Sequence, residues 1–129
     1  MNKQFAVAIV DDEEDMLEVM RLFFEDEVDF GNYKFHFYAS GAECLKNIHQ
    51  IDYLVSDINM PGMDGYQLVT EAKRVAPGLR ASLMSAYGGD EYKQKAQAIG
   101  IEQYFLKPLD IELIKSHLDQ AYKQIISGT

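Results

Sequence analysis

The chain has 129 residues, 21 acidic and 12 basic, with a formal charge of −9 and a single cysteine. This length predicts one domain whose core is large enough to be stable without disulfides or a structural metal. The acidic balance disfavours nucleic-acid binding because it repels phosphate backbones, and one Cys44 excludes an internal disulfide or a cysteine-based zinc cluster. We expect no membrane-spanning segment and no signal peptide, and therefore a soluble cytoplasmic domain without membrane contact.

The acidic excess is unevenly distributed along the chain. Residues 1–31 contain ten acids and two bases, whereas the remaining residues contain eleven acids and ten bases. The charge therefore belongs mainly to the first predicted helix and the segments that flank it.

Five short apolar runs alternate with five longer segments of helical periodicity. The runs, which we interpret as strands, are Phe5–Val10, Phe35–Tyr38, Tyr53–Ser56, Ala81–Ser85 and Gln103–Leu106. The first run is apolar without alternation, which is typical of a parallel strand covered by helices on both faces. The pattern predicts an α/β fold with a doubly wound, five-stranded parallel sheet in the order 2-1-3-4-5, a flavodoxin-like three-layer sandwich.

Apolar residues recur at one-face spacing in the predicted helices. The clearest stripes are Met16, Leu17, Met20, Phe23 and Phe24, then Leu68, Val69, Ala72 and Val75, then Ile111, Ile114, Leu118, Ala121, Tyr122 and Ile125. Helix caps are predicted at Ser40 with Glu43, Asp64, Asp90, Asp110 and Gly100. The segment 90–99 has few apolar anchors and is entered through two glycines, which indicates either low local stability or a merely exposed helix.

Polar side chains follow four of the predicted strands. Asp11 and Asp12 follow the first strand, Asp57 the third, Ser85 ends the fourth, and Lys107 follows the fifth. In such sheets the binding crevice lies at the carboxyl ends of the strands, where the strand order reverses. We therefore expect these five side chains to meet there.

Three converging carboxylates repel one another, and a hard divalent cation such as Mg²⁺ (or Mn²⁺) relieves that conflict. Lys107 supplies a positive charge and Ser85 a hydroxyl donor, both suited to phosphate oxygens. These groups are the parts needed for phosphoryl transfer, and a carboxylate can itself be the nucleophile. Asp57 is the natural acceptor, with Asp11 and Asp12 holding the metal from the side. Taken singly, each residue also has a plainer interpretation as a helix-capping, turn or solvated side chain.

Four motifs at these strand ends resemble the receiver domain of two-component response regulators. They are Ile9–Glu13, Val55–Gly65, Met84–Ala86 and Phe105–Pro108, and the resemblance runs from about residue 4 to residue 126. It implies a signalling phosphoacceptor rather than a general enzyme. We expect residues 1–129 to be one receiver domain, with no output domain in this chain.

The resemblance also implies individual roles. Asp57 would accept the phosphoryl group, and Mg²⁺ would be held by Asp12, Asp57, the backbone carbonyl of Asn59 and, through water, Asp11. Lys107 would pair with Asp57 and then with the phosphoryl group. The implied switch and peptide features are movement of Ser85 to the phosphoryl group, inward rotation of Tyr104 and a cis bond before Pro108.

The partners implied by the resemblance are a sensor histidine kinase or phosphotransfer protein, docking at the first helix, and a downstream output domain or protein. The output face would be the fourth helix, fifth strand and fifth helix, and it is also where homodimerisation on phosphorylation would occur. The acidic charge balance, rather than the resemblance, argues against direct nucleic-acid binding by this domain.

Three other functions fit the residues less well. A calcium loop after Asp57 fails because Pro61 and Leu68 stand where oxygen ligands are needed. A haloacid-dehalogenase-type phosphatase needs a second aspartate two residues after its nucleophile, where this chain has Asn59. A flavodoxin-like small-molecule binder needs a phosphate-cradling loop where Asp11 and Asp12 would repel phosphate.

Overall fold

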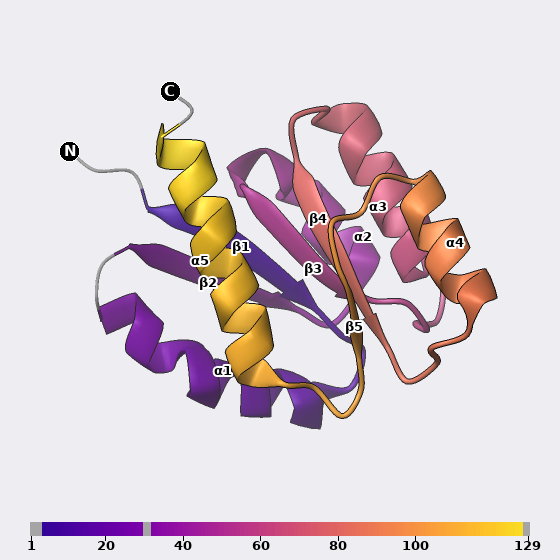
Figure 1. The fold of residues 1–129 in the computed structure, drawn as a ribbon, viewed down its shortest axis with the longest axis horizontal. Coiled ribbons are helices and arrows are strands. Elements are labelled where there is room, and N and C mark those ends of the chain that lie inside the picture. Colours follow the sequence, from indigo (N-terminus) through magenta and orange to yellow (C-terminus); the bar gives the residue numbers. More distant parts are fainter. Residues whose placement is uncertain (1–3, 30–31, 128–129) are drawn as a thin grey trace.

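The computed structural model describes the backbone of residues 4–29 and 32–127 and the side chains of residues 4–24 and 32–125 (Figure 1). Five parallel strands form one sheet in the order β2-β1-β3-β4-β5. The fold class predicted from the alternation of elements is therefore confirmed. None of the helices in the described part of the chain combines the length and apolarity that crossing a bilayer requires.

The strands follow the predicted order closely. They are β1 (Phe5–Val10), β2 (Tyr33–Tyr38), β3 (Tyr53–Asp57), β4 (Arg80–Ser85) and β5 (Tyr104–Leu106). The helices are α1 (Glu14–Asp29), α2 (Gly41–Lys46), α3 (Gly65–Val75), α4 (Asp90–Ala98) and α5 (Ile111–Ser127), with a 3-10 turn at Ile48–Gln50. β1 and β3 are neighbours in the sheet, so their carboxyl ends lie side by side.

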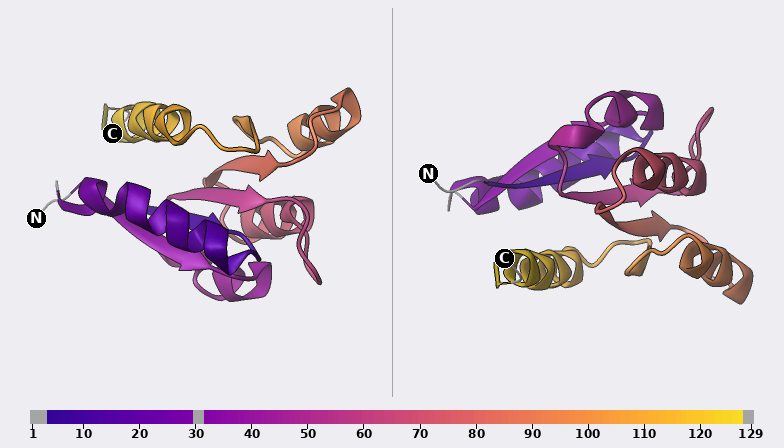
Figure 2. Two further views of the ribbon diagram at one scale, coloured as in Figure 1. Left: turned by 90° about the horizontal axis from the view of Figure 1, so that it is seen from below. Right: turned by 90° about the horizontal axis from the view of Figure 1, so that it is seen from above.

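The sheet separates two apolar cores. Figures 1 and 2 show helices on both faces of the sheet. One core joins the sheet to α2, α3 and α4, and the other joins it to α1 and α5. Alternate residues of β1 enter opposite cores: Val7 and Ile9 face α1 and α5, whereas Ala8 and Val10 face α2 and α3. Burial on both faces explains why this strand has no polar alternation.

Two residues assigned to apolar helix stripes are exposed, Phe23 mostly and Val75 in part. Phe23 of α1 is 59% exposed and Val75 at the end of α3 is 36% exposed, whereas Phe24 and Ala72 are buried. A helix turns by about 100° per residue, so the side chain of Phe23 points well away from that of its buried neighbour Phe24. The prediction that Phe23 shares one face of the helix with the rest of its stripe is wrong.

The caps agree with the predictions except at α4. Asp64 forms a reciprocal capping box with Gln67, and Asp110 Oδ1 accepts the amide of Leu113 at 3.1 Å. Asp90 is already the first residue of α4, so the predicted cap there is wrong and Gly89 takes the position without a side chain. Gly100 follows α4 with φ of 78°, a left-handed conformation that favours glycine.

Candidate functional site

Three carboxylates meet at the carboxyl ends of β1 and β3. One oxygen each from Asp11, Asp12 and Asp57 lies within 4.8 Å of the other two. Asp11 is 0% and Asp57 4% exposed, while Asp12 is half-buried. The prediction that these residues converge from separate strands is confirmed by the geometry.

Lys107 reaches the same cluster from the end of β5. Its Nζ lies 3.1 Å from Asp11 Oδ2 and 3.4 Å from Asp57 Oδ1, and its side chain is 13% exposed. The peptide bond between Lys107 and Pro108 is cis, as the resemblance implied. The ammonium thus lies between the two most buried acids of the cluster.

Glu13 is a neighbour of the site that the sequence did not single out. Its amide donates to Asp11 Oδ1 at 2.9 Å, and its carboxylate lies 3.8 Å from Lys107 Nζ. The available signal was the unbroken acidic run after β1. The hydrogen bond fixes one oxygen of Asp11 and leaves Oδ2 to Lys107.

The charges in the cluster are only partly compensated. Burial, followed by repulsion from Asp11, raises the pKa of Asp57 to about 6, although Lys107 acts in the opposite direction. Burial would lower the pKa of Lys107, but hydrogen bonding and attraction to Asp11 and Asp57 outweigh it and raise that pKa. One ammonium therefore faces three carboxyl groups, two of which are almost fully buried.

This donor set fits a hard divalent cation. Carboxylate oxygens are preferred ligands of Mg²⁺, which usually takes one or two of them and completes its shell with water, carbonyl or phosphate oxygens. A dication would offset the repulsion from Asp11, which adds to the effect of burial on the pKa of Asp57. The coarse expectation of an acidic cluster suited to Mg²⁺ therefore agrees with the residues present.

Gly65 allows α3 to begin directly against the end of β3. A Cβ at this position would lie 2.4 Å from the carbonyl oxygen of Asp57 and 2.8 Å from Cα of Ile58, both backbone atoms. Any side chain would therefore push α3 away from the strand that carries Asp57. Gly65 fixes the backbone of the site rather than its chemistry.

Ser85 ends β4 and is fully buried. Its Oγ accepts the amide N–H of Tyr87 at 3.0 Å, and Nδ2 of the exposed Asn59 lies 3.5 Å away. Tyr104 on β5 is half-buried, and its hydroxyl donates to the carbonyl of Tyr87. Ser85 and Tyr104 thus hold the same peptide segment from two sides.

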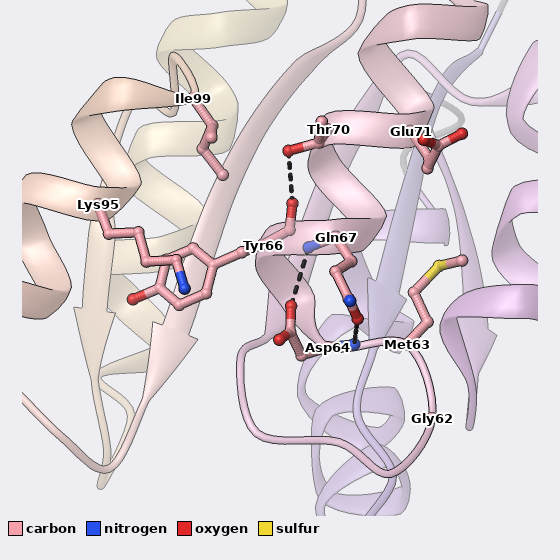
Figure 3. Close-up of a pocket in the computed structure, with 9 residues that line it drawn as sticks. All are labelled: Gly62, Met63, Asp64, Tyr66, Gln67, Thr70, Glu71, Lys95 and Ile99. Carbon is pink, nitrogen blue, oxygen red and sulfur yellow. Dashed lines mark hydrogen bonds between the residues drawn. The ribbon is translucent and has the colours of Figure 1, made fainter.

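A separate cavity of about 640 Å³ opens between α3 and α4 (Figure 3). It is lined by Gly62, Met63, Asp64, Tyr66, Gln67, Thr70, Glu71, Lys95 and Ile99. None of the three clustered aspartates borders it. The concave surface and the charged site are therefore different features of the molecule.

Known proteins share both the sequence pattern and the fold. The model of the response regulator receiver domain family matches residues 7–119. The transcriptional regulatory protein GlrR of Escherichia coli is 29% identical over 130 residues, which cover 99% of this chain and 28% of that protein. An uncharacterized 14.6 kDa protein of Leptolyngbya boryana is 33% identical over 115 residues, covering 87% of this chain and 86% of that one.

Solved receiver domains have the same fold. The CheY-like receiver domain protein of Methanospirillum hungatei superposes with a TM-score of 0.85 at 21% identity, covering 98% of this chain and 100% of that one. The receiver domain of an HD domain-containing protein from Pseudomonas fluorescens gives 0.86 at 23% identity, covering 97% and 99%. This chain spans about a quarter of the length of the transcriptional regulators GlrR and YesN. By its family match over most of its length, the chain belongs to the response regulator receiver domain family of two-component signal transduction.

Proposed function

We propose that Asp57 accepts a phosphoryl group from a phosphohistidine of a sensor histidine kinase or phosphotransfer protein. The observation that carries this proposal is the position of Asp57, buried at a strand end, with Lys107 Nζ 3.4 Å from one carboxylate oxygen. Asp11 and Asp12 each place a carboxylate oxygen close enough to Asp57 for the three residues to share one metal ion. A buried carboxylate beside an ammonium and a metal site is equipped to act as a nucleophile toward phosphorus.

The proposed step forms one bond and breaks one bond. A carboxylate oxygen of Asp57 attacks phosphorus to form the acyl phosphate, the P–N bond breaks, and its electron pair remains on the imidazole nitrogen. With its pKa at about 6, Asp57 is mainly ionised at pH 7.5 and can attack without a separate general base. Transfer to water later reverses the modification, so the chain catalyses only its own phosphorylation and dephosphorylation.

The residues around Asp57 have separate roles in this proposal. Asp12, Asp57, the carbonyl of Asn59 and, through water, Asp11 would hold Mg²⁺ or Mn²⁺. When bound, the cation supplies positive charge to the phosphoryl oxygens. Lys107 moves its ion pair from Asp57 to a phosphoryl oxygen.

The conformational response involves Ser85 and Tyr104. Ser85 donates its hydroxyl to a phosphoryl oxygen, and Tyr104 packs inward behind it. The output face is α4, β5 and α5, where Leu106 and Leu113 are 47% and 56% exposed. These apolar side chains would contact an output domain, an output protein or a second copy of the receiver.

The phosphodonor would dock on α1. Leu22 and Phe23 of this helix are 67% and 59% exposed, and the acidic side chains of Glu14 and Glu18 lie exposed on the same element. A complementary partner surface is apolar at its centre and basic around it. We also propose a cytoplasmic location, where such donors act, and a single receiver unit over residues 1–129.

The direct test is incubation with acetyl phosphate and Mg²⁺, followed by intact-mass measurement and phosphate release. The wild-type chain should gain one phosphoryl group, and the gain should disappear with EDTA and in Asp57→Asn. Asp64→Asn is the matched control, since asparagine also caps helices and Asp64 lies outside the cluster. Continuous release of many phosphate equivalents without accumulation would instead indicate the phosphatase alternative.

A further inference from the structure

The first turn of α4 depends on tyrosine contacts for its position. Among the residues of α4, all of which the structure describes, only Ala96 is buried, and Gly89 caps the helix without a side chain. Three tyrosines hold this turn and the connection that precedes it. We call Tyr66, Tyr87 and Tyr92 the tyrosine clasp.

Tyr66 connects α3 to α4. Figure 3 shows its ring directed from α3 toward α4, with Lys95 of α4 reaching over it. The Tyr66 hydroxyl donates to the carbonyl of Tyr92 at 3.1 Å, and Lys95 Nζ lies 4.4 Å from the ring centroid. Tyr66 is only 7% exposed, although the cavity of about 640 Å³ and another of about 150 Å³ both border it. Two cavities therefore border the contact that Tyr66 makes between the two helices.

Tyr87 connects α4 to the phosphorylation site. Its ring stacks on Tyr92 with a centroid distance of 5.7 Å and an interplanar angle of 15°. Its amide donates to Ser85 Oγ at 3.0 Å, and its carbonyl accepts the hydroxyl of Tyr104. Ser85, Tyr87, Tyr92 and Tyr66 therefore form an unbroken series of contacts from the end of β4 to the first turns of α3.

We propose that Tyr66 is a positioning residue which, through the tyrosine clasp, opposes the phosphorylated conformation of the receiver. This inference rests on the proposed function of Asp57 and Ser85. For Ser85 to turn its hydroxyl toward a phosphoryl group on Asp57, Oγ must move relative to the amide of Tyr87. Ser85 keeps its hydrogen bond from that amide only if the Tyr87 segment moves with it. The clasp holds that segment through stacking on Tyr92 and the hydrogen bond from Tyr66, so its movement must strain or break these contacts.

The receiver would therefore exchange between two conformations, one held by the clasp and one favoured by the phosphoryl group. A phosphoryl group shifts the receiver only by the difference in its interaction with the two conformations. A contact present in one conformation alone therefore changes how much phosphorylated protein accumulates. Loosening the tyrosine clasp favours phosphorylation, and it also loosens the wall of the cavity between α3 and α4.

The test uses Tyr66→Phe, which keeps the ring and its contact with Lys95 but removes the hydroxyl. Tyr122→Phe on α5 is the matched control, because it deletes the same group away from α4. The two readouts are amide hydrogen exchange over residues 88–93 without a phosphodonor, and the phosphorylated fraction at limiting acetyl phosphate with Mg²⁺. In Tyr66→Phe, both should rise by about fivefold, the equilibrium factor of one ordinary hydrogen bond.

The outcomes separate this inference from the proposed function. If wild-type protein acquires no phosphoryl group, the proposed function fails and the inference fails with it. If wild-type protein is phosphorylated but Tyr66→Phe has an unchanged or lower phosphorylated fraction, the inference alone is overturned, even when exchange in α4 is faster. In the double variant Tyr66→Phe/Tyr87→Ala, the free-energy change derived from the phosphorylated fraction should be smaller than the sum of the changes in the two single variants. Additive changes would also contradict a connected clasp.

Discussion

At the scale of single residues, Asp57 combines burial with incomplete charge compensation. Lys107 is shared between Asp57 and Asp11 at 3.4 and 3.1 Å, so it cannot neutralise both. The same arrangement that makes the folded chain less stable at neutral pH suits the cluster to a cation, as the proposed function requires. Function and stability therefore oppose each other at this position.

Asp57→Asn should stabilise the folded chain at neutral pH. The pKa of Asp57 is about 6 in the fold against 3.8 for a free group. The folded state therefore retains a proton that the unfolded state loses, and stability falls as pH rises through this window. Since asparagine does not titrate, the variant should gain up to about 3 kcal/mol of unfolding free energy above pH 7.

Urea unfolding in EDTA, compared near pH 4 and pH 7.5, measures this gain. It should be small at the lower pH and largest at the higher one. Adding Mg²⁺ should stabilise wild-type protein more than the variant, because a cation relieves the repulsion that asparagine has already removed. Equal stability of the two chains at pH 7.5 without Mg²⁺ would contradict the electrostatic account of Asp57.

The candidate site was largely predictable from the sequence because its residues directly follow strands. A parallel sheet brings all such positions to one edge, so order along the chain was sufficient to group Asp11, Asp57, Ser85 and Lys107. Pairwise contacts were not predictable in the same way. The hydrogen bond from Glu13 to Asp11 depends on one loop conformation that strand position does not determine.

At the scale of elements, α1 has two distinct faces. Leu17, Met20 and Phe24 are buried against the sheet, whereas Leu22 and Phe23 are exposed beside acidic side chains. The acids at 25, 26, 27 and 29, which also contribute to the charge of this region, have side chains outside the described residues. Apolar spacing alone could not identify the exposed pair, because an apolar residue beside the buried stripe satisfies the same pattern.

Phe23→Ala should slow phosphoryl transfer from a histidine kinase while leaving phosphorylation by acetyl phosphate unchanged. An exposed aromatic residue contributes to a protein interface but not to chemistry with a small donor, and its truncation costs about tenfold when it is central to the contact. Transfer from the kinase should also slow as salt rises, since salt screens attraction between the acidic helix and a basic partner.

Rates measured with both donors provide the comparison, and Val75→Ala is the control because it removes another partly exposed apolar side chain from α3. The docking proposal predicts a loss confined to the kinase reaction. A Phe23→Ala chain that accepts phosphoryl groups from the kinase at the wild-type rate, or a rate independent of salt, would argue against docking on α1.

At the scale of the whole molecule, α5 is attached to the sheet by polar as well as apolar contacts. Arg80 at the start of β4 pairs with Glu102, and His117 Nε2 of α5 lies 3.2 Å from Glu102 Oε1 and 2.8 Å from Tyr53 Oη. Burial alone would raise the pKa of Glu102, but the hydrogen bond and charge of Arg80, with His117, lower it. This network therefore links α5, one helix of the proposed output face, to β3, to the start of β4 and to the connection before β5.

The fold as a whole was predictable because the five-fold alternation of elements permits few topologies. With right-handed crossovers, the order 2-1-3-4-5 was the economical solution, and the sheet confirms it. The network of Arg80, Glu102 and His117 could not be predicted, since it joins residues from three separate segments through side-chain geometry. The same is true of the tyrosine clasp, whose members lie on α3, α4 and the connection before α4.

The position of the phosphoryl group on Asp57 can be determined chemically. Borohydride reduces an acyl phosphate to an alcohol, releasing phosphate and converting a phosphorylated aspartate to homoserine, which peptide mass spectrometry can locate. After treatment with acetyl phosphate and Mg²⁺ and then borohydride, we predict homoserine at position 57 and unmodified Asp11, Asp12 and Ser85. Homoserine at position 11 or 12, a phosphate ester on Ser85, or an unmodified chain would contradict it.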